Sequence, residues 1–122
     1  PAGALQAKVL KTSGAFHTSL MQPAANKLGA KLDEIRPRMS PPSVAVFANA
    51  TAAKIAPGTS PDVIVDLLKR QLTSSVLWEA SVKAMIADGV KEFYEVGPMK
   101  QLSAMMKRID PSVWKSTKNI VV

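Results

Sequence analysis

The sequence of 122 residues contains no cysteine and a single histidine. The lack of cysteine excludes disulfide bonds and cysteine-based metal sites. One histidine is too few for a zinc site, because zinc favours several nitrogen or sulfur ligands. Aromatic residues make up only 5% of the chain, which is too few for the stacking platforms on which single-stranded nucleic acids bind. We therefore expect neither a metal nor a nucleic acid among its ligands.

Long apolar runs are also missing. None approaches the roughly 20 residues that a membrane-spanning helix needs. Residues 1–4 begin neither the basic nor the apolar region of a secretory signal, so we expect a protein that is neither secreted nor embedded in a membrane. The chain also starts without methionine, and we expect that it has been cut or trimmed from a longer polypeptide.

The balance of charge is strongly basic. Sixteen Lys and Arg residues against nine Asp and Glu give a net charge of +7, which favours association with acidic partners. The basic residues are spread along the chain, with no run longer than two. This spread is a further argument against a nucleic acid, and an acidic protein or a phosphate-bearing substrate such as coenzyme A fits the net charge.

Strands and helices are expected to alternate along the chain. Apolar residues recur at helical spacing from Thr18 to Ile35. Ser60 followed by Pro61 is typical of a helix start, and Gly89 of a helix end. We expect strands at 5–10, 44–48, 92–96 and 119–122, and helices at 18–35, 61–72, 77–88 and 100–108. This order favours an α/β fold with a mainly parallel sheet.

Three short motifs, in a fixed order, indicate a family. Residues 14–17 (Gly-Ala-Phe-His) place the only histidine at the end of a loop, before an amphipathic helix. This segment resembles the catalytic-histidine segment of malonyl-CoA:acyl-carrier-protein transacylases and of the acyltransferase domains of polyketide and fatty-acid synthases. Residues 71–78 are similar to the family's Gln-Leu…Val-x-Trp segment, and residues 94–98 to its Glu-Val-Gly-Pro turn. Together the three motifs cover most of the chain.

The resemblance implies a two-step acyl transfer through a serine. The serine attacks the malonyl thioester of coenzyme A, and the thiol of the phosphopantetheine arm of acyl carrier protein then takes the acyl group. A serine hydroxyl needs a base to remove its proton, and an imidazole can do so near neutral pH. The resemblance assigns that task to His17, which is oriented by the backbone carbonyl of Gln71. The alternatives are a structural histidine at a helix start and a glutamine without a special task.

Phe16 is expected to contact the substrate. In the related acyltransferase domains, phenylalanine before the histidine accompanies malonyl units and serine accompanies methylmalonyl units. An aromatic ring fills the space that an α-methyl group would occupy, although one methyl changes binding by only about 1–3 kcal/mol. The alternative is that Phe16 is a residue of the hydrophobic core.

The sequence also departs from the family. It contains no Gly-x-Ser-x-Gly nucleophile motif, and the family's glutamine of the oxyanion hole and its malonate-binding arginine are missing. We therefore expect a companion polypeptide that carries the N-terminal part with the serine, and this chain alone should be inactive. Met99 stands where the family usually has glycine.

The resemblance also implies a fold. Residues 1–11 would be the edge of a small ferredoxin-like subdomain. Residues 12–122 would be the C-terminal part of an α/β-hydrolase-like large subdomain. Expected partners are malonyl-CoA and acyl carrier protein, without a cofactor, in the cytoplasm or in an organelle such as a plastid or mitochondrion.

Two other interpretations stay open at this point. The chain is also compatible with an acyltransferase domain fragment of a polyketide or fatty-acid synthase. An interpretation of another class is a non-catalytic basic binding module. Lys100, Lys107 and Arg108 would then be part of a charged surface, although they could equally face coenzyme A, acyl carrier protein or solvent. Asn49, directly after an expected strand, either approaches the active site or bonds within its own turn.

Overall fold

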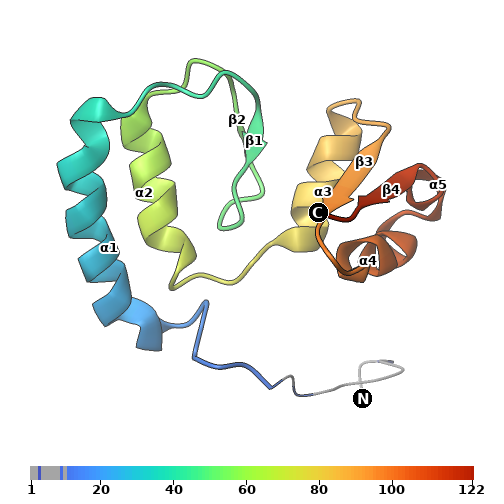
Figure 1. Cartoon of the computed structure of the whole chain (residues 1–122), viewed down its shortest axis with the longest axis horizontal. Helices are drawn as coiled ribbons and strands as arrows, with labels where there is room; N and C mark the ends of the chain where they lie inside the picture. The colour runs from blue at the N-terminus through green and yellow to red at the C-terminus, as the bar shows by residue number, and fades with distance from the viewer. Residues whose placement is uncertain (1–2, 4–8, 10) are drawn as a thin grey trace.

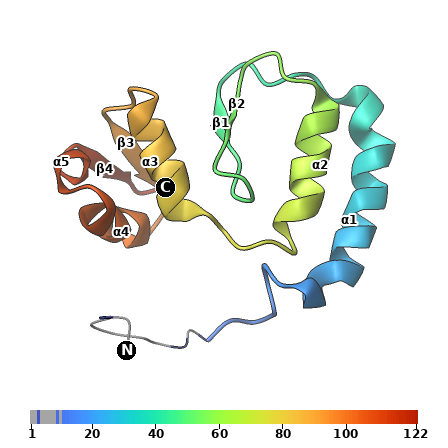
Figure 2. The same cartoon turned by 180° about the vertical axis from the view of Figure 1, so that it is seen from behind.

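The structure is a computed structural model that describes residues 3, 9 and 11–122. The strand expected at 5–10 and most of the expected subdomain segment 1–11 lie outside these residues. The described chain forms two lobes, which are joined by residues 72–77 (Figures 1 and 2). The N-terminal lobe comprises η1 (Ser19–Met21), α1 (Gln22–Ile35), η2 (Arg36–Arg38), β1 (Val46–Phe47), β2 (Lys54–Ile55) and α2 (Pro61–Gln71). The C-terminal lobe comprises α3 (Trp78–Ala87), β3 (Phe93–Val96), α4 (Gln101–Ile109), α5 (Pro111–Trp114) and β4 (Thr117–Ile120).

The N-terminal lobe is built on two antiparallel helices, α1 and α2. The Lys69 ammonium lies 2.8 Å from an Asp33 carboxylate oxygen. Just after the end of α1, the Arg36 guanidinium lies 3.0 Å from a carboxylate oxygen of Asp62, near the start of α2. The aliphatic part of Lys69 crosses α1 at Gly29, where an added Cβ would lie 3.3 Å from the Lys69 Cε. These contacts fix the register of the helices, so that the N-terminal end of α1 lies beside the C-terminal end of α2.

The C-terminal lobe contains a compact apolar cluster. Val82 of α3, Met106 of α4 and Val113 of α5 are buried at its centre, at 1%, 2% and 8% exposure. The side chains packed around this centre are Trp78, Ile86, Phe93, Ile109 and Trp114. The lobe therefore has a hydrophobic core of its own.

Two carboxylates cap the N-terminal ends of α4 and α5 in this lobe. Glu95 accepts hydrogen bonds from the N–H groups of Leu102 and Ser103 at 2.9 and 2.8 Å, and from the Ser103 hydroxyl. Partial burial raises the pKa of Glu95, but these hydrogen bonds outweigh it and hold the pKa below its ordinary value. The hydroxyl and N–H of Ser112 likewise lower the pKa of Asp110. Both carboxylates satisfy N–H groups that have no partner within the helix.

The sheet differs from the one that the sequence predicts. The described residues form two separate two-stranded sheets, an antiparallel pair β1–β2 and a parallel pair β3–β4. The α/β order is therefore present, but a single mainly parallel sheet is not formed by these residues, because each strand pairs only with one from its own lobe. The strand β2 was not expected. β4 overlaps the expected strand 119–122 but begins and ends two residues earlier.

The pair β3–β4 has one uncovered face. Phe93 and Glu95 point toward the helices, whereas Tyr94, Val96 and Ile120 on the other face are 51%, 63% and 43% exposed. Parallel sheets are normally covered on both faces, so this apolar face lacks its usual neighbour. No helix in the described part of the chain is long and apolar enough to cross a membrane.

Candidate active site

The loop before α1 holds the only histidine of the chain. Hydrogen bonds within the loop shape it: the Thr12 hydroxyl donates to the Gly14 carbonyl at 3.0 Å, and the Thr18 hydroxyl donates to the Ala15 carbonyl at 2.7 Å. Residue 16 and residue 17 therefore lie at the tip of a tight turn that leads directly into η1 and α1.

His17 has a left-handed backbone conformation, with φ of 62°. Residues other than glycine rarely adopt this conformation, although histidine does so more often than most. Such backbone strain costs on the order of 1–3 kcal/mol and tends to occur at functional sites. Nothing in the sequence pattern predicted it, and it presents the His17 ring to α2.

The ring of His17 is bound to the end of α2. Its Nδ1 lies 2.9 Å from the backbone carbonyl oxygen of Gln71. Because a carbonyl oxygen can only accept a hydrogen bond, the hydrogen must be on Nδ1. In the neutral ring, Nε2 then carries the free lone pair. The structure thus brings His17 and Gln71 together through the main-chain atom that the resemblance implied, and it leaves Nε2 free to take a proton.

The partner of this ring is a group at the end of α2. Gln71 is the last residue of α2, and its carbonyl is one of the four at a helix C-terminus that lack a partner within the helix. These carbonyls give the C-terminus a partial negative charge. In the described part of the chain, His17 therefore has a backbone dipole rather than a carboxylate as its orienting partner.

Phe16 directly precedes His17 in the chain and lies outside the core. It is 50% exposed, and its ring folds back over Gly14, where an added Cβ would lie 3.3 Å from the ring. The interpretation of Phe16 as a core residue does not fit this exposure. An exposed aromatic ring next to His17 can contact a small acyl group.

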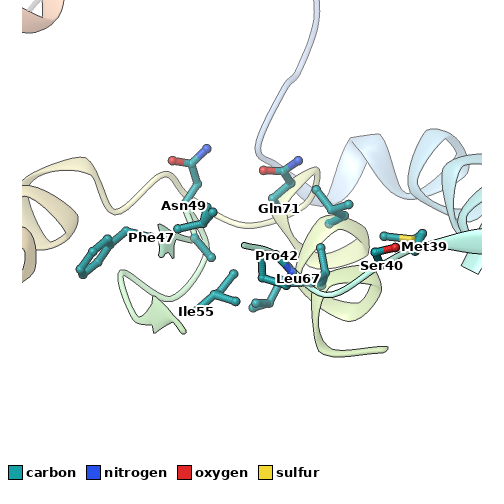
Figure 3. Close-up of a pocket in the computed structure, with 12 residues that line it drawn as sticks. Met39, Ser40, Pro42, Phe47, Asn49, Ile55, Leu67 and Gln71 are labelled. Carbon is teal, nitrogen blue, oxygen red and sulfur yellow. The ribbon is translucent and has the colours of Figure 1, made fainter. Parts of the chain in front are cut away.

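An apolar pocket lies on the other side of Gln71. It has a volume of about 280 Å³ and lies between α2 and the β1–β2 hairpin. Pro42, Ile55 and Leu67 line its interior, whereas the side-chain amides of Asn49 and Gln71 point to one side at its edge (Figure 3). Sequence analysis did not predict this pocket, because its lining comes from segments up to 32 residues apart (from Met39 to Gln71).

Within the described residues there is no group of three or more His, Asp or Glu that could hold a metal ion.

The comparisons with curated proteins and with solved structures agree with each other. No protein-family model matches the chain. Over 118 residues, or 97% of its length, the chain is 41% identical to the malonyl CoA-acyl carrier protein transacylase of Escherichia coli K12. It is homologous to the C-terminal part of malonyl-CoA:acyl-carrier-protein transacylases. The transacylase of Vibrio cholerae has the same fold over 99% of the chain, with a TM-score of 0.77 and 36% identity.

A third relative is a malonyl-transacylase that was solved in complex with a type II polyketide-synthase acyl carrier protein. It superimposes with a TM-score of 0.79 at 31% identity and covers 99% of this chain. The chain spans only 37% of the Escherichia coli transacylase and 36% of the transacylase in the complex. The transacylases therefore contain almost two thirds of their length outside the region that matches this chain.

Proposed function

We propose that this chain supplies the histidine base of a malonyl-CoA:acyl-carrier-protein transacylase. The serine nucleophile would come from a part of the enzyme outside these 122 residues. The observation that carries the proposal is the hydrogen bond of 2.9 Å between His17 Nδ1 and the Gln71 carbonyl, because it leaves Nε2 unprotonated and fixed in direction.

In the first step, the serine hydroxyl attacks the thioester carbon of malonyl-CoA. His17 Nε2 takes the hydroxyl proton as the carbon–oxygen bond forms. The ring becomes positively charged, and the C-terminal end of α2 stabilises this charge. When the tetrahedral intermediate collapses, the carbon–sulfur bond breaks and His17 returns the proton to the sulfur of coenzyme A.

In the second step, the same ring acts in the opposite direction. His17 takes the proton of the phosphopantetheine thiol of acyl carrier protein while the sulfur attacks the acyl-serine ester. The proton then passes to the serine oxygen as the ester bond breaks, and the free serine is restored. Phe16, exposed beside the ring, would contact the malonyl group and leave little space for an α-methyl group.

The fold extends the same proposal. Residues 12–122 would belong to an α/β-hydrolase-like large subdomain, and residues 1–11 to the edge of a ferredoxin-like small subdomain. The two short sheets and the exposed apolar face of Tyr94, Val96 and Ile120 support a companion polypeptide segment that covers them. The enzyme would act in the cytoplasm or in an organelle, without a cofactor.

The C-terminal lobe offers a surface for an acidic partner. Lys100, Lys107 and Arg108 line a cleft beside Trp114, and Lys107 lies 4.8 Å from the centre of the Trp114 ring. None of the three is in a salt bridge among the described residues, so their charges are available to acyl carrier protein or to the phosphates of coenzyme A. A transacylase of polyketide synthesis is an alternative of the same class, since a solved relative is in complex with the acyl carrier protein of such a system.

A chimeric enzyme, called the joined enzyme below, tests the proposal. In it, this chain replaces the matching 118 residues of the Escherichia coli transacylase, and malonyl transfer to acyl carrier protein is measured. Transfer is expected, and His17→Ala should lower it by about 10²- to 10⁴-fold, as expected for loss of a general base. Asn26→Ala, on the exposed face of α1, serves as the matched control.

Two results would contradict the proposal. One is near-normal transfer by the His17→Ala enzyme. The other is a joined enzyme that unfolds cooperatively but transfers no malonyl group. Salt-dependent binding of nucleic acid by this chain would then favour the basic binding module instead.

A further inference from the structure

Asn49 is a polar residue whose side chain the proposed mechanism does not use. It lies two residues after the end of β1, at the edge of the apolar pocket that Gln71 also lines (Figure 3). In open parallel α/β sheets, ligands bind outside the carboxyl ends of the strands, whereas β1 pairs antiparallel with β2. The position alone makes no site, so the bonds of Asn49 decide what it can do.

The main chain around Asn49 is held on both sides. The Asn49 carbonyl accepts a hydrogen bond of 2.9 Å from the N–H of Leu77 in the segment between the lobes. Just before it, the Ala48 carbonyl accepts from the N–H groups of Thr51 and Ala52 at 3.3 and 2.8 Å. The backbone of the turn is therefore fixed, and with it the direction of the Asn49 Cα–Cβ bond.

The side-chain amide itself has no hydrogen-bond partner among the residues that the structure describes. An asparagine that only shapes a turn bonds to the backbone nearby, and Asn49 does not do so. Its amide offers two donors and an acceptor oxygen, and Asn49 is exposed at the pocket edge. An exposed amide without a partner, beside an apolar pocket, is accessible to a segment that covers the pocket.

The pocket beside Asn49 indicates the chemistry of that partner. None of its lining residues is charged, so nothing there would hold the carboxylate of malonate or the phosphates of coenzyme A. An apolar interior with two amides at the edge fits a polypeptide segment, which places apolar side chains inside and peptide groups at the edge. The transacylases have enough chain for this, since almost two thirds of their length lies outside the matched region.

We infer that Asn49 is a positioning residue that hydrogen-bonds a main-chain peptide group of the segment carrying the serine. This inference rests on the proposed function. Gln71 lines the same pocket edge and binds His17 Nδ1, so a segment held at this edge lies next to the histidine ring. Asn49 would thereby keep the serine hydroxyl within reach of Nε2 without touching the reacting atoms.

The expected effect is on rate rather than on substrate binding. A small misplacement of a reacting group can cost about 100-fold in rate. In the joined enzyme, Asn49→Ala should lower kcat by roughly 10- to 100-fold, while the KM for malonyl-CoA changes by less than about twofold. Asn49→Asp keeps the shape but loses both donors and gains a charge, so it should not restore kcat. Asn26→Ala is the matched control.

Thermal unfolding gives a second measurement that does not depend on activity. Because the Asn49 amide has no partner in this chain, Asn49→Ala should leave the unfolding midpoint of the 122-residue chain unchanged and lower that of the joined enzyme. A raised KM with an unchanged kcat would overturn the inference in favour of a substrate contact. Unchanged kinetics would also overturn it, as would equal loss of stability in both proteins. An inactive parent enzyme would contradict the proposed function, while the unfolding comparison would still decide the role of Asn49.

Discussion

The two lobes are stabilised by different means. In the N-terminal lobe, α1 and α2 are joined by ion pairs at the surface and by the packing of Lys69 over Gly29. In the C-terminal lobe, three helices enclose a buried apolar cluster. His17, the proposed base, and its partner Gln71 both belong to the lobe with the polar connections. The lobe with the better core contributes a scaffold and a basic surface.

This difference has a physical reason. A histidine that acts as the proposed base must be reached by serine and substrate, so it cannot be buried in a core. Its direction is set instead by a helix end and a strained turn, which are fixed by the register of α1 on α2. The comparison teaches that the register of two helices can position a base where packing cannot. Each of the following predictions tests one of the two lobes.

The largest effect is expected from Met106→Ala in the C-terminal lobe. The Met106 side chain is only 2% exposed, and its removal should destabilise that lobe by about 2–5 kcal/mol. Both tryptophans of the chain, Trp78 and Trp114, pack on this core, so their fluorescence during urea unfolding reports on this lobe. If the N-terminal lobe loses its helical signal at the same urea concentration, the two lobes are not independent.

A change of specificity is expected from Phe16→Ser in the N-terminal lobe. Because the ring is half exposed, its removal should affect the site and leave the fold intact. In the joined enzyme, the preference for malonyl-CoA over methylmalonyl-CoA should fall by roughly 10-fold, as one methyl group is worth about 1–3 kcal/mol. Competition between the two substrates measures this ratio. An unchanged ratio would show that Phe16 does not select the acyl group.

An acid-dependent effect is expected from Glu95→Gln. The folded pKa of Glu95 is lowered, so its contribution to stability is fully present above its ordinary value of 4.5 and is lost as the pH falls through the lowered folded value. Thermal unfolding of the variant should occur at a lower temperature than that of the parent at pH 7. The gap should close as the pH falls below 4.5. A gap that is the same at every pH would contradict the role of the carboxylate.

The smallest effect is expected from Gly29→Ala, and it is stabilising. Alanine in a helix interior is favoured over glycine by about 0.5–1 kcal/mol. The new Cβ would lie 3.3 Å from the Lys69 Cε, and the flexible lysine side chain can move slightly. Urea unfolding followed by circular dichroism measures the gain. A loss of stability would show that the packing of Lys69 on Gly29 cannot adjust.

Much of the secondary structure could be predicted from the sequence. The helix signals at Ser60, Pro61 and Gly89 are local, and the structure has α2 and α3 where these signals placed them. The strand at 92–96 was similarly evident from its apolar residues and the Gly-Pro that follows. Local chemistry is sufficient for elements of this kind.

The arrangement of the strands could not be predicted in the same way. β2 has only two residues, Lys54 and Ile55, which is too short for an alternating pattern. Which strands pair depends on contacts between distant segments, and here each lobe forms its own pair. The left-handed turn at His17 and the free amide of Asn49 are likewise properties of the folded chain.

The central claim is that the register of α1 on α2 holds His17 as a base with a free Nε2. Nitrogen-15 NMR of the histidine ring tests it most directly, because the chain has one histidine and the ring signals need no further assignment. For the neutral ring we predict a hydrogen on Nδ1, a coupling between that hydrogen and the Gln71 carbonyl, and an unprotonated Nε2. A neutral ring with its hydrogen on Nε2 would contradict the account.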